Sequence, residues 1–190
     1  MNFSELKDKL QGPIYSIITP FTETEDIDYD SLGNYIEYLY KGGARIFYAM
    51  AFNTRYLLMN NREIMDINQF IIKKVKSLDE NNIVIVGDPL HCSTKTSIEF
   101  AKHARDNGAD VISLIYRAYL FFDEHVYNHY KAVADTVPDI GILVHEMPFM
   151  KGIPQYQDGT WSLGLIDKLA NIHSVVAMKE DAKQDDYTRQ

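Results

Sequence analysis

The chain has 190 residues, 46% of them hydrophobic and 24% charged, a composition typical of globular proteins and unlike that of disordered chains. Its 27 acidic and 19 basic side chains give a net charge of −8, which argues against binding to nucleic-acid phosphates or to anionic membranes. Because Cys92 is the single cysteine, no internal disulfide can form, and we expect a cytoplasmic protein. No apolar run reaches the roughly 18 residues that span a bilayer, and the opening MNFSELKDKLQG is too polar for a signal peptide. We expect one domain over residues 1–190.

Six short segments rich in β-branched and aromatic residues recur about every 30 residues, which is the length of a strand-helix unit. They lie at 14–19, 45–50, 82–87, 110–116, 140–145 and 173–178. Most are apolar without alternation, as in strands that are covered on both faces. This pattern predicts six parallel strands.

Helical patterns lie between these segments. They predict a helix that ends at Gly42-Gly43, a second up to Leu78, a third from Ser93-Thr94 to Gly108, a fourth over 123–135, a fifth over 161–170 and a sixth that begins near Asp185. This strict alternation is typical of a doubly wound sheet or of a (β/α)8 TIM barrel. TPFTETEDIDYD follows the first strand where a dinucleotide-binding sheet has a glycine-rich loop, which favours the barrel. A barrel usually needs about 250 residues, so we expect six of its β/α units here.

Residues at the C-terminal ends of barrel strands all face one mouth, whatever their separation in sequence. Lys179 directly follows the strand segment VVAM, and an amine that emerges from the interior can attack a carbonyl; a lysine that extends to solvent is the alternative. His145 ends the fifth strand and can move protons near neutral pH, or simply form a hydrogen bond at the rim. Arg55 can clamp a carboxylate or pair with a neighbouring acid.

Two further groups of residues carry weaker signals. Tyr116 and Tyr119 follow the fourth strand and either line the mouth or pack in the core. A metal site is conceivable at the strand ends, but no H-x-H or H-x-x-x-H spacing supports it, and we expect neither a metal nor another cofactor. Its ligands would be Asp88, His91, His145 and Glu146.

Read in order, several segments resemble the dihydrodipicolinate synthase and N-acetylneuraminate lyase family of class I aldolases. They are ITPFTETEDIDYDSL, GGARIF, STKTSIEFAKHARDNGAD, YNHYKAVAD and LANIHSVVAMKEDAKQDDYTR. The resemblance implies a (β/α)8 barrel in which Lys179 forms a Schiff base with pyruvate or a related 2-oxo acid. It also implies that about a third of the family's length lies beyond this sequence, and that the protein forms homo-oligomers, either tetramers or dimers.

The chain departs from the family at three places near the mouth. Ala51 to Arg55 replace the Gly-Thr-Thr-Gly-Glu loop that holds the substrate carboxylate, His145 stands where the family has a tyrosine, and the Pro-Tyr-Tyr segment is changed. We therefore predict a Schiff-base lyase or aldolase of altered specificity, for which pyruvate is in doubt. Its catalytic residues would be Lys179 and His145, and its substrate would be bound by Phe52, Asn53, Arg55, Tyr116 and Tyr119. The alternatives are a non-catalytic relative that binds a small acid and a metal-dependent lyase or hydrolase.

Overall fold

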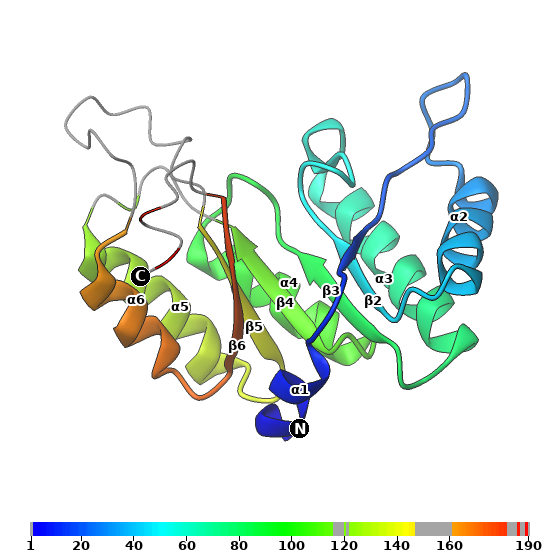
Figure 1. The fold of residues 1–190 in the computed structure, drawn as a ribbon. Helices are drawn as coiled ribbons and strands as arrows, with labels where there is room; N and C mark the ends of the chain where they lie inside the picture. The colour runs from blue at the N-terminus through cyan, green and yellow to red at the C-terminus, as the bar shows by residue number, and fades with distance from the viewer. Residues whose placement is uncertain are drawn as a thin grey trace.

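The computed structural model describes residues 2–115, 120, 122–146, 161–181, 186 and 189. Its strands are β1 (Tyr15–Ser16), β2 (Ile46–Ala49), β3 (Ile83–Gly87), β4 (Val111–Ile115), β5 (Gly141–Glu146) and β6 (Val175–Glu180). They form one sheet in the order β1-β2-β3-β4-β5-β6, and every neighbouring pair is parallel. The order never reverses, as it would in a doubly wound sheet. The predicted barrel class is confirmed, with these strands forming a half-barrel (Figure 1).

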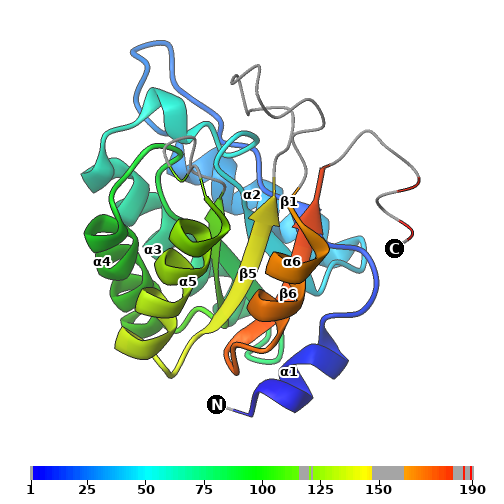
Figure 2. The ribbon, with the colours of Figure 1, turned by 90° about the vertical axis from the view of Figure 1, so that its left-hand side faces the viewer.

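The five helices predicted between the strands are confirmed. They are α2 (Tyr29–Lys41), α3 (Asn61–Leu78), α4 (Thr94–Asp106), α5 (Asp123–Thr136) and α6 (Leu163–Ala170). They lie outside the curved sheet, and a short 3-10 helix, η1 (Tyr56–Leu58), precedes α3 (Figure 2). None of the helices in the described part of the chain combines the length and apolarity needed to cross a membrane. The expected start of a further helix near Asp185 lies outside the described residues.

Local signals explain where the helices begin and end. At the start of α3 the Asn60 side chain accepts from the backbone N–H of Glu63, whose own side chain accepts from the N–H of Asn60. Ser93 is the N-cap of α4, and its side chain accepts a hydrogen bond from the backbone N–H of Thr96. After α2 and α4, Gly43 and Gly108 have φ angles of +101° and +91°, which glycine adopts without steric penalty.

Apolar side chains form two layers, one on each face of the sheet. The outer layer lies between strands and helices and includes Phe47, Ile71 and Ile112. The inner layer fills the concave face and includes Ile46, Ile83, Ile85, Val111 and Leu143. Both faces are therefore covered, which accounts for strands that are apolar without alternation.

An additional helix, α1 (Phe3–Lys9), was not predicted. It lies below the N-terminal ends of the strands (Figure 1) and buries Phe3 and Leu6 in the inner layer. Seven residues with two buried side chains give too little periodicity to identify such a helix from sequence. At the same edge, β1 is shorter than the segment predicted at 14–19, since only Tyr15 and Ser16 pair with β2; Ile14 and Ile18 are exposed.

Candidate functional site

Lys179 and His145 lie side by side on the concave face of the sheet. They are register partners on the neighbouring strands β6 and β5, so their side chains point to the same side. The Nζ atom of Lys179 lies 3.1 Å from Nε2 of His145. The imidazole is 1% exposed, whereas the lysine side chain keeps 29% of its surface exposed and is reachable from the mouth.

Asp181 joins this pair, although the sequence reasoning did not identify it. Its Oδ2 atom accepts a hydrogen bond from Lys179 Nζ and lies 2.9 Å from His145 Nε2. Lys179 and Asp181 are two positions apart, the spacing that places side chains on one side of an extended chain. The Lys-x-Asp spacing was the available signal.

The protonation of His145 and Asp181 follows from their surroundings. Burial, and then the positive charge of Lys179, lowers the pKa of His145 to about 4, against the raising effect of Asp181. Burial raises the pKa of the Asp181 carboxyl, but hydrogen bonds from Lys179 and His145 outweigh it and hold this pKa below its ordinary value. A neutral imidazole thus lies beside an ammonium–carboxylate ion pair, and its Nε2 is placed to accept a proton from Lys179.

The loop from Ala51 to Arg55 is held against the end of β1 by a reciprocal pair of hydrogen bonds. The Thr54 hydroxyl donates to the carbonyl oxygen of Ile17 at 2.8 Å, and the Thr19 hydroxyl donates to the carbonyl oxygen of Thr54 at 2.7 Å. Both threonine side chains are buried. The Thr54 hydroxyl is therefore engaged with the backbone and turned away from solvent.

Three predicted substrate-binding residues lie together on this loop. Phe52, Asn53 and Arg55 line an open cavity of about 440 Å³, whose walls also include Ile18, Leu57 and Leu58. Arg55 has a φ angle of +64°, a left-handed conformation that costs a non-glycine residue roughly 1 kcal/mol. Its guanidinium forms no hydrogen bond or ion pair with any residue that the structure describes, so the alternative of pairing with a neighbouring acid is not observed.

The predicted site residues are thus distributed over two places. Lys179 and His145 meet at β5–β6, and neither lines the cavity that holds Phe52, Asn53 and Arg55. Tyr116 and Tyr119 lie outside the described residues.

The four residues considered as metal ligands do not meet. His145 faces the concave side, whereas the next residue, Glu146, accepts a hydrogen bond from the backbone N–H of Trp161 in the outer layer at 2.6 Å. His91 is exposed. Within the described ranges, no group of three or more His, Cys, Asp or Glu side chains could hold a metal ion.

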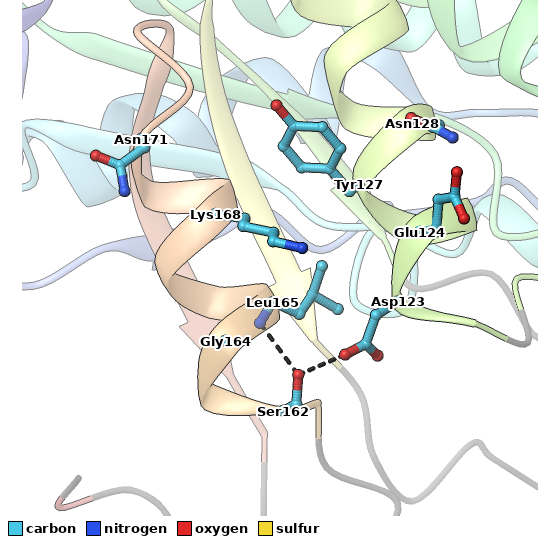
Figure 3. Close-up of a pocket in the computed structure, with 9 residues that line it drawn as sticks. All are labelled: Asp123, Glu124, Tyr127, Asn128, Ser162, Gly164, Leu165, Lys168 and Asn171. Carbon is cyan, nitrogen blue, oxygen red and sulfur yellow. Dashed lines mark hydrogen bonds between the residues drawn. The ribbon is translucent and has the colours of Figure 1, made fainter.

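A larger open cavity, about 640 Å³, lies between α5 and α6 on the outside of the sheet (Figure 3). At its end the Ser162 hydroxyl accepts from the N–H of Leu165 at 3.1 Å and donates to Asp123, which ties the start of α6 to α5. None of the predicted site residues lines this cavity.

Comparison with known proteins gives consistent matches over almost the whole chain. Residues 9–189 match the dihydrodipicolinate synthetase family. The chain is 24% identical over 179 residues to a 4-hydroxy-tetrahydrodipicolinate synthase of Psychrobacter arcticus, covering 94% of this chain and 56% of the relative. It is 28% identical over 166 residues to the human N-acetylneuraminate lyase, covering 86% of this chain and 51% of the relative.

Comparison of the fold with solved structures also gives a match in this family. A crystal structure of chloride-inhibited dihydrodipicolinate synthase from Acinetobacter baumannii, complexed with pyruvate, matches with a TM-score of 0.78 at 26% identity. The match covers 90% of this chain and 55% of that one. The chain therefore spans about half the length of the proteins it matches.

Proposed function

This chain belongs to the dihydrodipicolinate synthetase family, and on that premise we propose that the protein is a Schiff-base lyase or aldolase with Lys179 and His145 as its catalytic pair. The observation that carries the proposal is the distance of 3.1 Å between Lys179 Nζ and His145 Nε2. An amine nucleophile next to a neutral base, with the base itself held by a third group, is the arrangement that covalent catalysis requires.

The first step in this proposal is transfer of a proton from the Lys179 ammonium to Nε2 of His145. The freed amine then attacks the carbonyl carbon of the substrate: a carbon–nitrogen bond forms, the carbonyl π bond breaks, and a proton moves from the attacking nitrogen to the oxygen. The His145 imidazolium then donates its proton to the hydroxyl of the carbinolamine, the carbon–oxygen bond breaks, and water leaves to give the protonated imine. Asp181 remains an acceptor for both residues throughout.

We propose a 2-oxo acid or a related carbonyl compound as substrate, with a specificity that differs from that of pyruvate-using relatives. The guanidinium of Arg55, which pairs with no residue in the described part of the chain, and the amide of Asn53 are suited to an anionic group, in a cavity that Lys179 itself does not line. Phe52 and the exposed side chains of Ile18 and Leu57 beside them favour an apolar extension on the substrate.

The test is trapping of the imine. The full-length protein is incubated with a panel of 2-oxo acids of increasing side-chain size, sodium borohydride is added, and the peptides are analysed by mass spectrometry. We expect a reduced adduct on Lys179 in wild type, its loss in Lys179→Met, and its retention in Lys131→Met, which changes an exposed lysine on α5. Absence of an adduct with every compound would overturn the proposal.

If calorimetry then detects binding of a small acid without any adduct, the protein is a binding relative of the family. Self-association stays a prediction, which sedimentation velocity of the full-length protein tests.

A further inference from the structure

A pair of hydroxyl groups lies behind His145, on the side away from Lys179. The Tyr48 hydroxyl is 3.3 Å from Nδ1 of His145 and 2.6 Å from the hydroxyl oxygen of Ser113. Tyr48 comes from β2 and Ser113 from β4, so the tyrosine reaches across β3 to meet the serine. All three side chains are at most 3% exposed.

The Tyr48 hydroxyl can hydrogen-bond to His145 in either neutral tautomer, with Ser113 as its second partner. When Nδ1 carries the proton, it donates to the Tyr48 oxygen, Tyr48 donates to Ser113, and Nε2 is left to accept from Lys179. When Nε2 carries the proton, it donates to Asp181, and Nδ1 accepts from Tyr48, which in turn accepts from Ser113. When the ring proton is on the other nitrogen, the two hydroxyl hydrogens rotate and the contacts of Nδ1 are kept, because each hydroxyl is both donor and acceptor.

We propose that Tyr48 and Ser113 are positioning residues: the Tyr48 hydroxyl hydrogen-bonds to Nδ1 of His145 in both neutral tautomers and in the imidazolium, and Ser113 holds that hydroxyl, so that Nε2 can take a proton from Lys179 and later return it. This inference rests on the function proposed above for Lys179 and His145.

The proton transfer balances without any further reactant. The bond between a proton and Lys179 Nζ breaks, a bond between that proton and His145 Nε2 forms, and the total charge of the pair stays at plus one. In the resulting imidazolium both ring nitrogens carry protons. Nδ1–H then donates to the Tyr48 oxygen and Nε2–H to the Asp181 carboxylate, so neither donor is left unsatisfied in a buried place.

The environment keeps Tyr48 in its neutral form for this task. Burial raises the pKa of the Tyr48 phenol well above its ordinary value, so it acts as a hydroxyl and not as a phenolate. The charged groups that act on His145 are Lys179 and Asp181 from the β6 side and Asp88 from the end of β3. The proton moves between Lys179 and His145 only, and Tyr48 stays a neutral hydrogen-bond partner throughout.

The decisive measurement is nuclear magnetic resonance of the His145 ring nitrogens in full-length protein labelled with nitrogen-15. We expect the Tyr48→Phe variant to shift the Nδ1 and Nε2 resonances, because the balance between tautomers changes when the partner of Nδ1 is lost. We expect the rate of imine formation to fall about tenfold, the effect of one ordinary hydrogen bond. KM should change little, because Tyr48 is buried behind the ring and does not reach the substrate.

Two further variants separate this role from general structural damage. Ser113→Ala should show part of the loss seen with Tyr48→Phe. Ser113→Thr keeps the hydroxyl and should have the wild-type rate of imine formation and the wild-type His145 resonances. Tyr56→Phe removes an equally buried phenol hydroxyl, which donates to Asn68 and to the carbonyl oxygen of Ala49, and should leave the His145 resonances unchanged. If Tyr48→Phe does not fold, Ser113→Ala and Ser113→Thr carry the same comparison.

The outcomes distinguish this inference from the proposed function. If wild type forms the imine, and Tyr48→Phe forms it equally fast with unchanged ring resonances, the positioning role is refuted and the proposed function stands. If wild type traps no carbonyl compound, the proposed function fails, and the positioning role in that reaction fails with it.

Discussion

Acid should destabilise the folded protein through His145, and the size of the effect follows from its burial. The pKa of His145 is lowered to about 4 from the ordinary value of 6.5, so the unfolded chain takes up a proton on this residue at a higher pH than the folded protein does. The contribution to stability is therefore fully present above pH 6.5, falls as the pH drops from 6.5 towards 4, and is lost below that. Linkage gives a loss of about 2 kcal/mol at pH 5 and about 3 kcal/mol at full protonation.

Urea unfolding at pH 7.5 and pH 5.0 measures this contribution when wild type is compared with His145→Gln. Titrating groups that do not contact His145 act in both proteins, so the change in their difference reports on His145 together with its partner Asp181. A third protein, Lys179→Met, should raise the pKa of His145, because the lysine charge is the second cause of its depression, and should therefore show a smaller loss than wild type. If the wild-type and His145→Gln curves shift equally with pH, burial does not lower the pKa of His145 in the folded protein, and the prediction is refuted.

Two other substitutions test how the site is supported. Leu6→Ala should lower the free energy of unfolding by about 2–4 kcal/mol, because Leu6 is buried in the inner layer. Glu5→Ala, on the exposed side of α1, should change the free energy of unfolding little. Equal effects of the two substitutions in urea unfolding would contradict the inner-layer packing. Thr54→Val should cost about 1–3 kcal/mol and weaken substrate binding, because the carbonyl oxygen of Ile17 loses its donor, while Thr54→Ser keeps the hydroxyl and should behave as wild type in both measurements.

Much of the architecture was predictable because the signals for it are local. Mostly apolar segments without alternation mark β3, β4 and β5 as strands covered on both faces. Ser93, Gly43 and Gly108 mark helix ends through hydrogen bonds and φ angles that involve only neighbouring residues. The meeting of Lys179 and His145 was also predictable, because residues at the ends of adjacent parallel strands face the same mouth.

Other features depend on contacts between residues far apart in sequence. In the sequence nothing distinguishes Tyr48 from the other residues of its strand. Its hydrogen bond to His145 joins positions that are 97 residues apart. Asp181 gains its role only when β5 and β6 pair in a register that places its carboxylate beside the imidazole. The sequence alone determined that six strands and their helices would alternate and that Lys179 would lie at the C-terminal end of the sixth strand. Tertiary structure decided which polar groups share one buried environment, because strand register and sheet curvature set those distances, and with them the protonation of His145.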